Sequence, residues 1–163
     1  MTKVLVIYSS QSGNTKNLAN AILEGVKEVT EVECEIKHVS EVSNKDLVGA
    51  DGIIVGSPVY FGSMSAEVKE MFDKSVAIRK KLEGKIGAAF TTSGHHTGGK
   101  ETTIFSILQA MLIHGMIIVG DPISAGGHYG VACVGSPDTD GINSAKALGK
   151  RVAEITKRFD LYG

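Results

Sequence analysis

The sequence predicts an α/β protein, a three-layer sandwich in which helices cover both faces of a five-stranded parallel sheet. Short apolar runs alternate with helical patterns along the whole chain. Four of these runs are nearly continuous and partly β-branched, which is typical of parallel strands buried on both faces. They are Val4–Ile7, Ile53–Val55, Ile86–Phe90 and Ile117–Val119.

A fifth run, Glu31–Val39, has a different pattern. It alternates apolar residues with charged ones, so one of its faces is wetter than the other. Such a pattern predicts an edge strand. An edge second strand beside a buried first strand fits the order 2-1-3-4-5, which places a ligand crevice at the carboxyl ends of strands one and three.

Helical periodicity fills the segments between the strands. The segment Thr102–Ile113 is apolar on more than one side, so we expect it to be deeply buried. The glycine-rich stretch Asp121–Gly130 predicts a surface loop, and Val131–Val134 after it is apolar enough to extend the fifth strand. The other expected helices are Asn14–Val29, Asn44–Val48, Ala66–Ile78 and Ser144–Phe159.

Composition narrows the function classes. The 163 residues fit one domain, 1–163, and a net charge of −1 argues against a nucleic-acid surface. No apolar run is long enough to span a bilayer. Met1 leads almost directly into a core strand, which leaves no room for a targeting peptide, so we expect a cytoplasmic protein. Cys34 and Cys133 have neither metal nor redox spacing.

The loop after the first strand has the makeup of a phosphate cradle. Backbone N–H groups at a helix N-terminus are unpaired, and the helix dipole makes them attractive to anions. Three hydroxyl residues add donors, and the loop holds no lysine, so it suits a phosphate that is bound and not transferred. The alternative is a capped turn with no ligand. The residues are Ser10, Gln11, Ser12, Gly13, Asn14 and Thr15.

Two more loops follow strands that should end at the same edge of the sheet. Pro58 ends the third strand, and an aromatic pair and a glycine follow it. The segment Gly94–Lys100 nearly matches a nucleotide-hydrolase phosphate loop, but Glu101 cannot supply the hydroxyl that binds Mg²⁺. His95 and His96 are adjacent, which is poor spacing for a metal, so no metal site is expected.

These motifs together resemble one family. The pattern Ser10-x-Ser12-Gly13-x-Thr15, straight after the first strand, resembles the FMN-phosphate loop of the flavodoxin family. The segments Pro58–Met64, Thr92–Glu101 and His114–Val119 resemble the flavin-ring loops of its WrbA branch. That branch holds FMN-dependent NAD(P)H:quinone oxidoreductases, and the similarity covers nearly the whole chain.

The resemblance implies a flavodoxin-like fold and an FMN site built from three loops. It implies that flavin N5 carries the chemistry with no catalytic side chain, that NAD(P)H is the electron donor, and that a quinone or other small molecule is the acceptor. Besides the cradle, the expected FMN contacts are Pro58, Val59, Tyr60, Phe61, Gly62, Thr92, Ser93, Gly94, His95, His96 and Gly98.

Other residues are weaker candidates. His128 and Tyr129, in the glycine-rich loop, are within possible reach of a substrate, in this subunit or a neighbouring one. His114 ends a helix, where a histidine commonly caps carbonyl groups. The WrbA branch has a further histidine near the flavin where this chain has Ile113.

Three readings of function remain open. The first is a WrbA-type reductase, and the second is a flavodoxin-like electron carrier that turns over nothing alone. The third is a flavin-binding module with a regulatory or structural role. The modest net charge favours the enzyme, whereas the short chain and the absence of tryptophan favour the carrier. The resemblance also implies a homo-oligomer, a dimer or a tetramer, although the chain is short in regions that build the WrbA tetramer.

Overall fold

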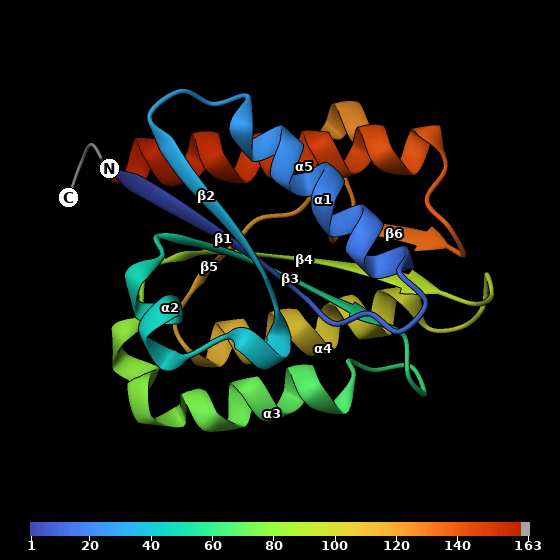
Figure 1. Cartoon of the computed structure of the whole chain (residues 1–163), viewed down its shortest axis with the longest axis horizontal. Helices are drawn as coiled ribbons and strands as arrows, with labels where there is room; N and C mark the ends of the chain where they lie inside the picture. Colours follow the sequence, from blue (N-terminus) through green and yellow to red (C-terminus); the bar gives the residue numbers. More distant parts are fainter. Residues whose placement is uncertain (161–163) are drawn as a thin grey trace.

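A parallel sheet with helices on both faces forms the protein (Figure 1). The computed structural model describes residues 1–160. Helices α1 and α5 cover one face, and α2, α3 and α4 cover the other (Figure 1). The strands are β1 (Thr2–Tyr8), β2 (Val32–His38), β3 (Gly52–Pro58), β4 (Ile86–Ser93), β5 (Ile117–Ile118) and β6 (Val131–Val134). The helices are α1 (Asn14–Lys27), α2 (Asn44–Gly49), α3 (Ala66–Lys74), α4 (Lys100–Ile113) and α5 (Thr139–Asp160), with 3-10 turns η1 (Val39–Glu41), η2 (Ser75–Lys81) and η3 (Ile123–Ala125).

The predicted strand order is confirmed as β2-β1-β3-β4-β5, and β6 also pairs with β4. Since β3 pairs along nearly the whole of one edge of β4, both β5 and β6 occupy the other edge. Ile117 lies opposite Ile86, whereas Val131 lies opposite Phe90, further along the same strand. The predicted extension of the fifth strand is therefore present as a separate strand, with residues 119–130 looping out between the two.

The edge strand β2 is confirmed. Two of its charged residues, Glu35 and Lys37, are half-buried and form ion pairs, whereas Glu33 is exposed. The Glu35 carboxylate lies 2.7 Å from Lys3 Nζ and 3.1 Å from Lys37 Nζ, and Lys37 Nζ reaches Asp46 of α2 at 2.6 Å. The Lys37 ammonium, with two bonds from Ser43, lowers the pKa of Asp46 to about 2. These ion pairs fix α2 against the wetter face of the edge strand.

Two helices begin or end four or more residues away from their predicted bounds. Helix α3 ends at Lys74, because Ser75 Oγ donates to the Phe72 carbonyl and the 3-10 turn that follows has non-helical dihedrals at Ile78. Helix α5 starts five residues earlier than predicted. Asp138 Oδ1 accepts the Gly141 N–H at 2.8 Å, which caps the first turn.

The predicted deep burial of α4 is wrong. Its inner side packs against the sheet, but its outer side exposes Phe105 (39%), Leu112 (59%) and Ile113 (67%). Periodicity alone suggested burial because the helix is apolar on both sides. Among the described residues, the sheet covers the inner side of α4, and nothing covers the outer side.

Helices α1 and α5 pack closely against each other. Gly25 and Gly149 sit where the two helices meet, and a Cβ at either position would clash with the backbone of the facing helix, at Lys146 or Ile22. Among residues 1–160, no helix is both long and apolar enough to cross a membrane.

Candidate functional site

The predicted phosphate cradle is an open loop between β1 and α1. Gly13, at φ 93°, sits in the left-handed region just before α1, and no side chain caps the helix there. The N–H groups of the first turn therefore lack the side-chain acceptor that most helices supply. Ser10 Oγ accepts the Gly13 N–H at 3.1 Å, which holds the loop folded back on itself. Gln11 and Ser12 are exposed at its tip, and Asn14 is half-buried.

Thr92, at the end of β4, joins the three predicted loops. Its Oγ1 lies 2.7 Å from Thr15 Oγ1 in the protein interior, which connects it to the cradle. Its carbonyl accepts the Val59 N–H at 2.9 Å, which connects it to the loop after β3. The structure thus places Thr92 as a structural link at the centre of the site.

A tight turn closes the loop after β3. Tyr60 and Ser63 exchange two backbone hydrogen bonds of 3.0 Å, and the two residues between them have positive φ, 49° at Phe61 and 73° at Gly62. A bulky residue in this region is strained, and such strain clusters at binding sites. The Phe61 side chain is fully exposed at the tip of the turn. The Phe61 ring is therefore a large aromatic surface that no other described residue covers.

The loop after β4 is held by its own side chains. Ser93 Oγ donates to the His95 carbonyl at 2.7 Å, and the Gly98 N–H donates to the same carbonyl. His95 Nδ1 accepts the Thr97 N–H at 3.2 Å, so the proton of the neutral ring is on Nε2. Gly94 and His96 are exposed on the loop. This loop is narrow and carries small residues, so its backbone is accessible.

Glycines bring the second and third loops together. A Cβ on Gly99 would approach Gly62 Cα to 2.7 Å, so the tip of the β3 turn rests against the start of α4. The three loops therefore form one continuous edge at the carboxyl end of the sheet. The three loops thus meet at the carboxyl end of the sheet, the end at which the strand order predicts ligand binding.

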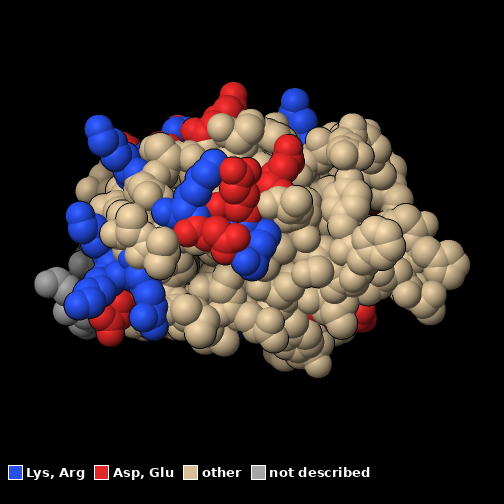
Figure 2. All heavy atoms as spheres, turned by 90° about the horizontal axis from the view of Figure 1, so that it is seen from below, with Lys and Arg blue, Asp and Glu red and all other residues tan. Residues whose placement is uncertain are grey.

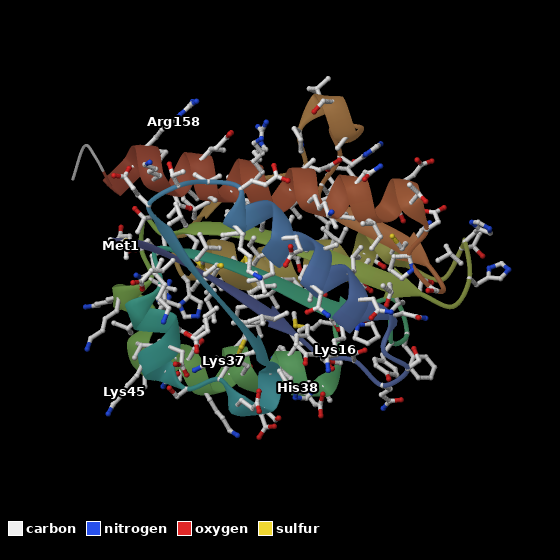
Figure 3. The ribbon with its side chains drawn as sticks, turned by 45° about the horizontal axis from the view of Figure 1, so that its top comes forward. Met1, Lys16, Lys37, His38, Lys45 and Arg158 are labelled. Atoms are coloured by element: carbon white, nitrogen blue, oxygen red, sulfur yellow. The ribbon has the colours of Figure 1, made fainter. Side chains whose placement is uncertain are left out.

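Two charged residues near the cradle were not predicted from the sequence. Lys16, labelled in Figure 3, lies in the first turn of α1 and adds a positive charge beside the loop. Glu67, in the first turn of α3, accepts the hydroxyl of the buried Ser9 at 2.8 Å. Sequence patterns gave no signal for Glu67, because it is 58 residues away from Ser9 along the chain.

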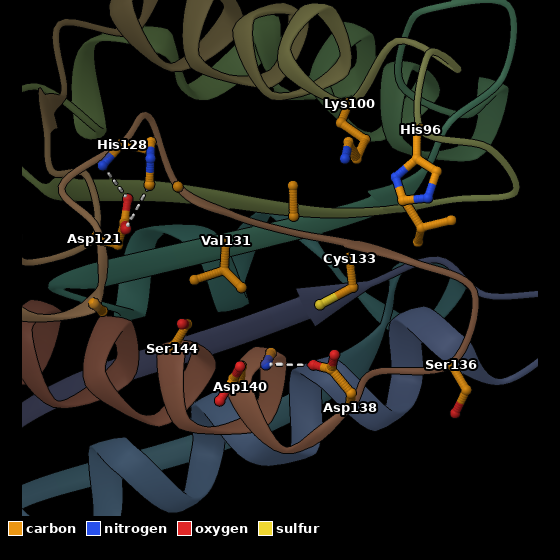
Figure 4. A pocket seen from close by; sticks show the side chains of 15 residues that line it. His96, Lys100, Asp121, His128, Val131, Cys133, Ser136, Asp138, Asp140 and Ser144 are labelled. Atoms are coloured by element: carbon orange, nitrogen blue, oxygen red, sulfur yellow. Dashed lines mark hydrogen bonds and ion pairs between the residues drawn. The ribbon is translucent and has the colours of Figure 1, made fainter.

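A polar cavity of about 410 Å³ lies beside the loop after β4 (Figure 4). His96 lies at one end, and His128 and Asp121 lie at the other (Figure 4). The buried Asp121 accepts the His128 N–H at 2.8 Å, and its second oxygen is 3.4 Å from His128 Nδ1. Asp121 thus holds His128 in place, a contact that sequence analysis missed although Asp121 is the only carboxylate between residues 102 and 137.

Cys133 also lines this cavity, and the pKa of its thiol is raised. Burial raises its pKa, Asp138 raises it further, and Lys100 opposes the shift. A thiol with a raised pKa stays protonated at neutral pH and is a poor nucleophile. Among residues 1–160, no group of three His, Cys, Asp or Glu side chains is arranged to hold a metal ion.

Of the two predicted substrate residues, His128 lines the same polar cavity as His96 of the loop after β4, and Tyr129 does not line it. The Tyr129 ring packs on Phe105 of α4, with 4.5 Å between centroids, and is half exposed. His128 borders both the polar cavity and an apolar groove on the other side. Their role as substrate contacts stays a prediction. His114 is buried, with Nε2 2.7 Å from Ser75 Oγ.

The cradle fits the phosphate of FMN. It offers an uncapped helix N-terminus and serine hydroxyls, and its neighbouring turn exposes a strained aromatic residue. A parallel sheet in this strand order, with such a loop after β1, is typical of flavodoxin-like domains.

Comparison with known proteins supports this class and identifies the family within it. The model of the NADPH-dependent FMN reductase family matches residues 2–130, and the chain belongs to that family. A protein from Archaeoglobus fulgidus named NAD(P)H dehydrogenase (quinone) is 36% identical over 190 residues, covering 98% of this chain and all of the relative. A flavodoxin from Aquifex aeolicus is 37% identical over 165 residues, covering 98% of this chain and 89% of the relative.

A solved structure extends the likeness to the fold. The flavodoxin, WrbA-like protein from Agrobacterium tumefaciens superposes with a TM-score of 0.82 at 24% identity, over 97% of this chain and 99% of that one. At this identity the likeness bears on the fold alone. The resemblance to the flavodoxin-like family seen in the sequence is confirmed.

Proposed function

We propose that the protein is an FMN-dependent oxidoreductase that passes electrons from NAD(P)H to a quinone. The observation that carries this proposal is the meeting of three loops at the carboxyl end of the sheet, beside an uncapped helix N-terminus. The family and the quinone-reductase relative support the reaction class.

Each loop would hold a different part of FMN. The first-turn N–H groups of α1, with Ser10 and Ser12, would bind the phosphate. Tyr60 and Phe61 would lie against the flavin ring and exclude water from it. The backbone N–H groups of residues 93–98 would face the polar edge of the ring, where negative charge develops on reduction. When bound, FMN supplies the hydride acceptor and donor at N5.

The protein's own part is to bind and expose the ring. A reductase must admit a flat nicotinamide and then a flat quinone in turn, so one face of the ring has to be accessible. The loop 93–99 consists of small residues and two histidines. In the turn after β3, the aromatic side chain of Phe61 is fully exposed, whereas that of Tyr60 is only partly exposed. This geometry favours an open site over one sealed by stacked aromatic side chains.

A second candidate is an electron carrier. The Aquifex aeolicus relative is named flavodoxin, and it is as similar to this chain as the quinone-reductase relative is. Carriers dock on redox proteins through charged surfaces. In the view from the α3 and α4 side, the half of the surface nearer the loops is almost free of charged side chains (Figure 2). We therefore place the reductase first.

The setting in the cell is part of the same proposal. Free Cys34 and Cys133 fit a reducing compartment, so we place the enzyme in the cytoplasm. A quinone or another small molecule would be the acceptor, and a homo-oligomer, a dimer or a tetramer, would be the working state.

Anaerobic mixing tests the proposal. The FMN-loaded protein is mixed with NADH or NADPH, and the loss of flavin absorbance is followed. We expect full bleaching by at least one nicotinamide within seconds, and return of the oxidised spectrum when benzoquinone is added. Failure of both nicotinamides to bleach a protein that dithionite does bleach would assign it as a carrier.

A further inference from the structure

The polar cavity of about 410 Å³ beside the loop after β4 has walls of opposite charge (Figure 4). His96 and Lys100 lie on one wall, where the loop enters α4, and Asp138 and Asp140 lie on the other, at the start of α5. Beyond the effect of burial, the pKa of the Cys133 thiol between the walls is raised by Asp138 and lowered by Lys100, so both walls act on it. The volume of the cavity is within the range of about 300–1,000 Å³ that is typical of small-molecule sites.

Several polar side chains of this cavity have no partner. Among residues 1–160, Lys100 and Asp140 make neither a hydrogen bond nor an ion pair, and the hydroxyls of Ser136 and Ser144 make no hydrogen bond. The other two carboxylates that line the cavity already accept hydrogen bonds from backbone N–H groups. The charged groups left open to a ligand are therefore a cation on the α4 wall and a carboxylate on the α5 wall.

Backbone groups add to the α4 wall and to the floor of the cavity. Helix α4 begins at Gly99, which has φ 103° and provides no side-chain cap, so the first N–H groups of the helix lack a side-chain acceptor and favour an anion. Strand β6 lines the floor and pairs with β4 alone among the described strands, so its other edge has no partner strand. The cavity thus combines an anion site, a hydrogen-bonding strand edge and an acceptor of hydroxyl groups.

We propose that this cavity binds the ADP-ribose half of NADH, and that Asp140 makes NADH the preferred donor over NADPH. The inference rests on the proposed reductase function, because the nicotinamide would lie at the flavin ring and the rest of the dinucleotide would cross the loop after β4 into the cavity. The diphosphate would face Lys100 and the start of α4. The adenosine ribose would face Asp140, and a carboxylate that accepts the ribose 2′-hydroxyl is the usual way in which a dinucleotide site recognises NAD.

The two walls match a dinucleotide better than they match a simple anion. A lone phosphate would gain from Lys100 but would leave the carboxylate of Asp140 without a hydrogen-bond donor, whereas a dinucleotide supplies both a diphosphate and a diol. The 2′-phosphate of NADPH would add about two negative charges at the wall that carries Asp138 and Asp140. Sites for NADP accommodate this group with an arginine, and no arginine lines the cavity.

Calorimetric titration with ADP-ribose, which has no nicotinamide, tests the cavity without any flavin reduction. We expect FMN-free and FMN-loaded protein to bind ADP-ribose with a dissociation constant below about 1 mM, and to bind 2′-phospho-ADP-ribose about tenfold more weakly or worse. Lys100→Gln should weaken ADP-ribose binding about tenfold, because it removes a charge-assisted hydrogen bond to the diphosphate. Lys45→Gln, at an exposed position in α2, is the matched control and should bind ADP-ribose normally.

A second variant tests the selectivity. Asp140→Asn should tighten binding of 2′-phospho-ADP-ribose and bring its affinity close to that of ADP-ribose, because it removes the repulsion and keeps an acceptor oxygen. Asp73→Asn, on the exposed side of α3, should keep the native preference. The Asp140 side chain has no partner among residues 1–160, so the fold should be retained, as circular dichroism can verify.

Four results would overturn the proposal: no binding of ADP-ribose, unchanged binding by Lys100→Gln, an unchanged preference in Asp140→Asn, or binding of inorganic pyrophosphate as tight as that of ADP-ribose. Bleaching of the flavin by NADH in a protein that does not bind ADP-ribose would refute the cavity and leave the reductase function standing. Binding of ADP-ribose with the expected effects of both variants would support the cavity even if neither nicotinamide bleached the flavin, and the reductase function would then be the part that failed.

Discussion

The hydroxyl of Ser9 donates a 2.8 Å hydrogen bond to Glu67 Oε2, directly beneath the loop assigned to the FMN phosphate. Ser9 is buried, and its N–H is bonded to the Gly56 carbonyl, so the start of the loop is fixed on both sides. The bond places a carboxylate close to the loop that we propose for the phosphate. Glu67 therefore stabilises the loop and at the same time repels the phosphate that the loop would bind.

We expect Glu67→Gln to tighten FMN binding a few-fold. The amide oxygen can still accept the Ser9 hydroxyl, while removal of the charge relieves a repulsion worth less than about 1 kcal/mol at this exposed site. Fluorescence titration with FMN at low and high salt measures it, and the gain should shrink as salt screens the charge. Glu70→Gln, one turn further along α3, is the matched control and should change little.

Ser12→Asp should have the opposite effect. It places an anion at the tip of the cradle, and repulsion of the phosphate should weaken FMN binding by about 1–4 kcal/mol, depending on how much water the loop excludes. Ser124→Asp, at an exposed position in η3, should bind FMN normally. Unchanged binding of FMN by Ser12→Asp would mean that the loop is wrongly assigned.

Riboflavin, which lacks the phosphate, should bind the native chain far more weakly than FMN does, because each lost charge-assisted bond is worth roughly 1.5–3 kcal/mol.

Phe61→Asn should separate stability from cofactor binding. Phe61 has φ 49°, a region that asparagine tolerates better than a bulky residue does. Its side chain is fully exposed, so its loss removes no packing. We expect the FMN-free variant to be as stable as the native chain or up to about 1 kcal/mol more stable, and its FMN affinity to fall. Thermal unfolding without FMN and a flavin titration measure the two effects, and a destabilised variant with native FMN affinity would contradict the assigned role.

Acid should weaken the β2 edge through Asp46. Its pKa is lowered from 3.8 to about 2 in the folded state, chiefly by Lys37. A lowered carboxyl pKa adds stability above the unfolded value, and that stability is lost as the pH falls from about 4 toward 2. Because the pair is partly solvated, we expect about 1 kcal/mol. Urea unfolding of native protein and Asp46→Asn across this range measures it, and the difference between them should vanish at the acid end.

The fold and the three loops were predictable because parallel α/β sheets obey strong rules. Alternation in Val32, Cys34 and Ile36 marked the edge strand, and continuous apolar runs marked the buried ones. Once the strand order is known, the carboxyl ends of β1 and β3 must meet, so the site follows.

The contacts within the site were less predictable. The bond between Ser9 and Glu67 and the linking role of Thr92 depend on side-chain directions between distant segments. The exposed stripe of α4 could not be found from periodicity, because an apolar pattern reports that a side chain prefers burial and not what buries it.

Steady-state turnover tests the central claim, that this chain is a flavin reductase with an open ring. The rate of NAD(P)H oxidation by the FMN-loaded protein is measured while the nicotinamide and benzoquinone are both varied. Since the two substrates must use the same ring face in turn, we expect ping-pong kinetics, with parallel lines in double-reciprocal plots. No turnover above free FMN, or intersecting lines that show both substrates bound together, would contradict the account.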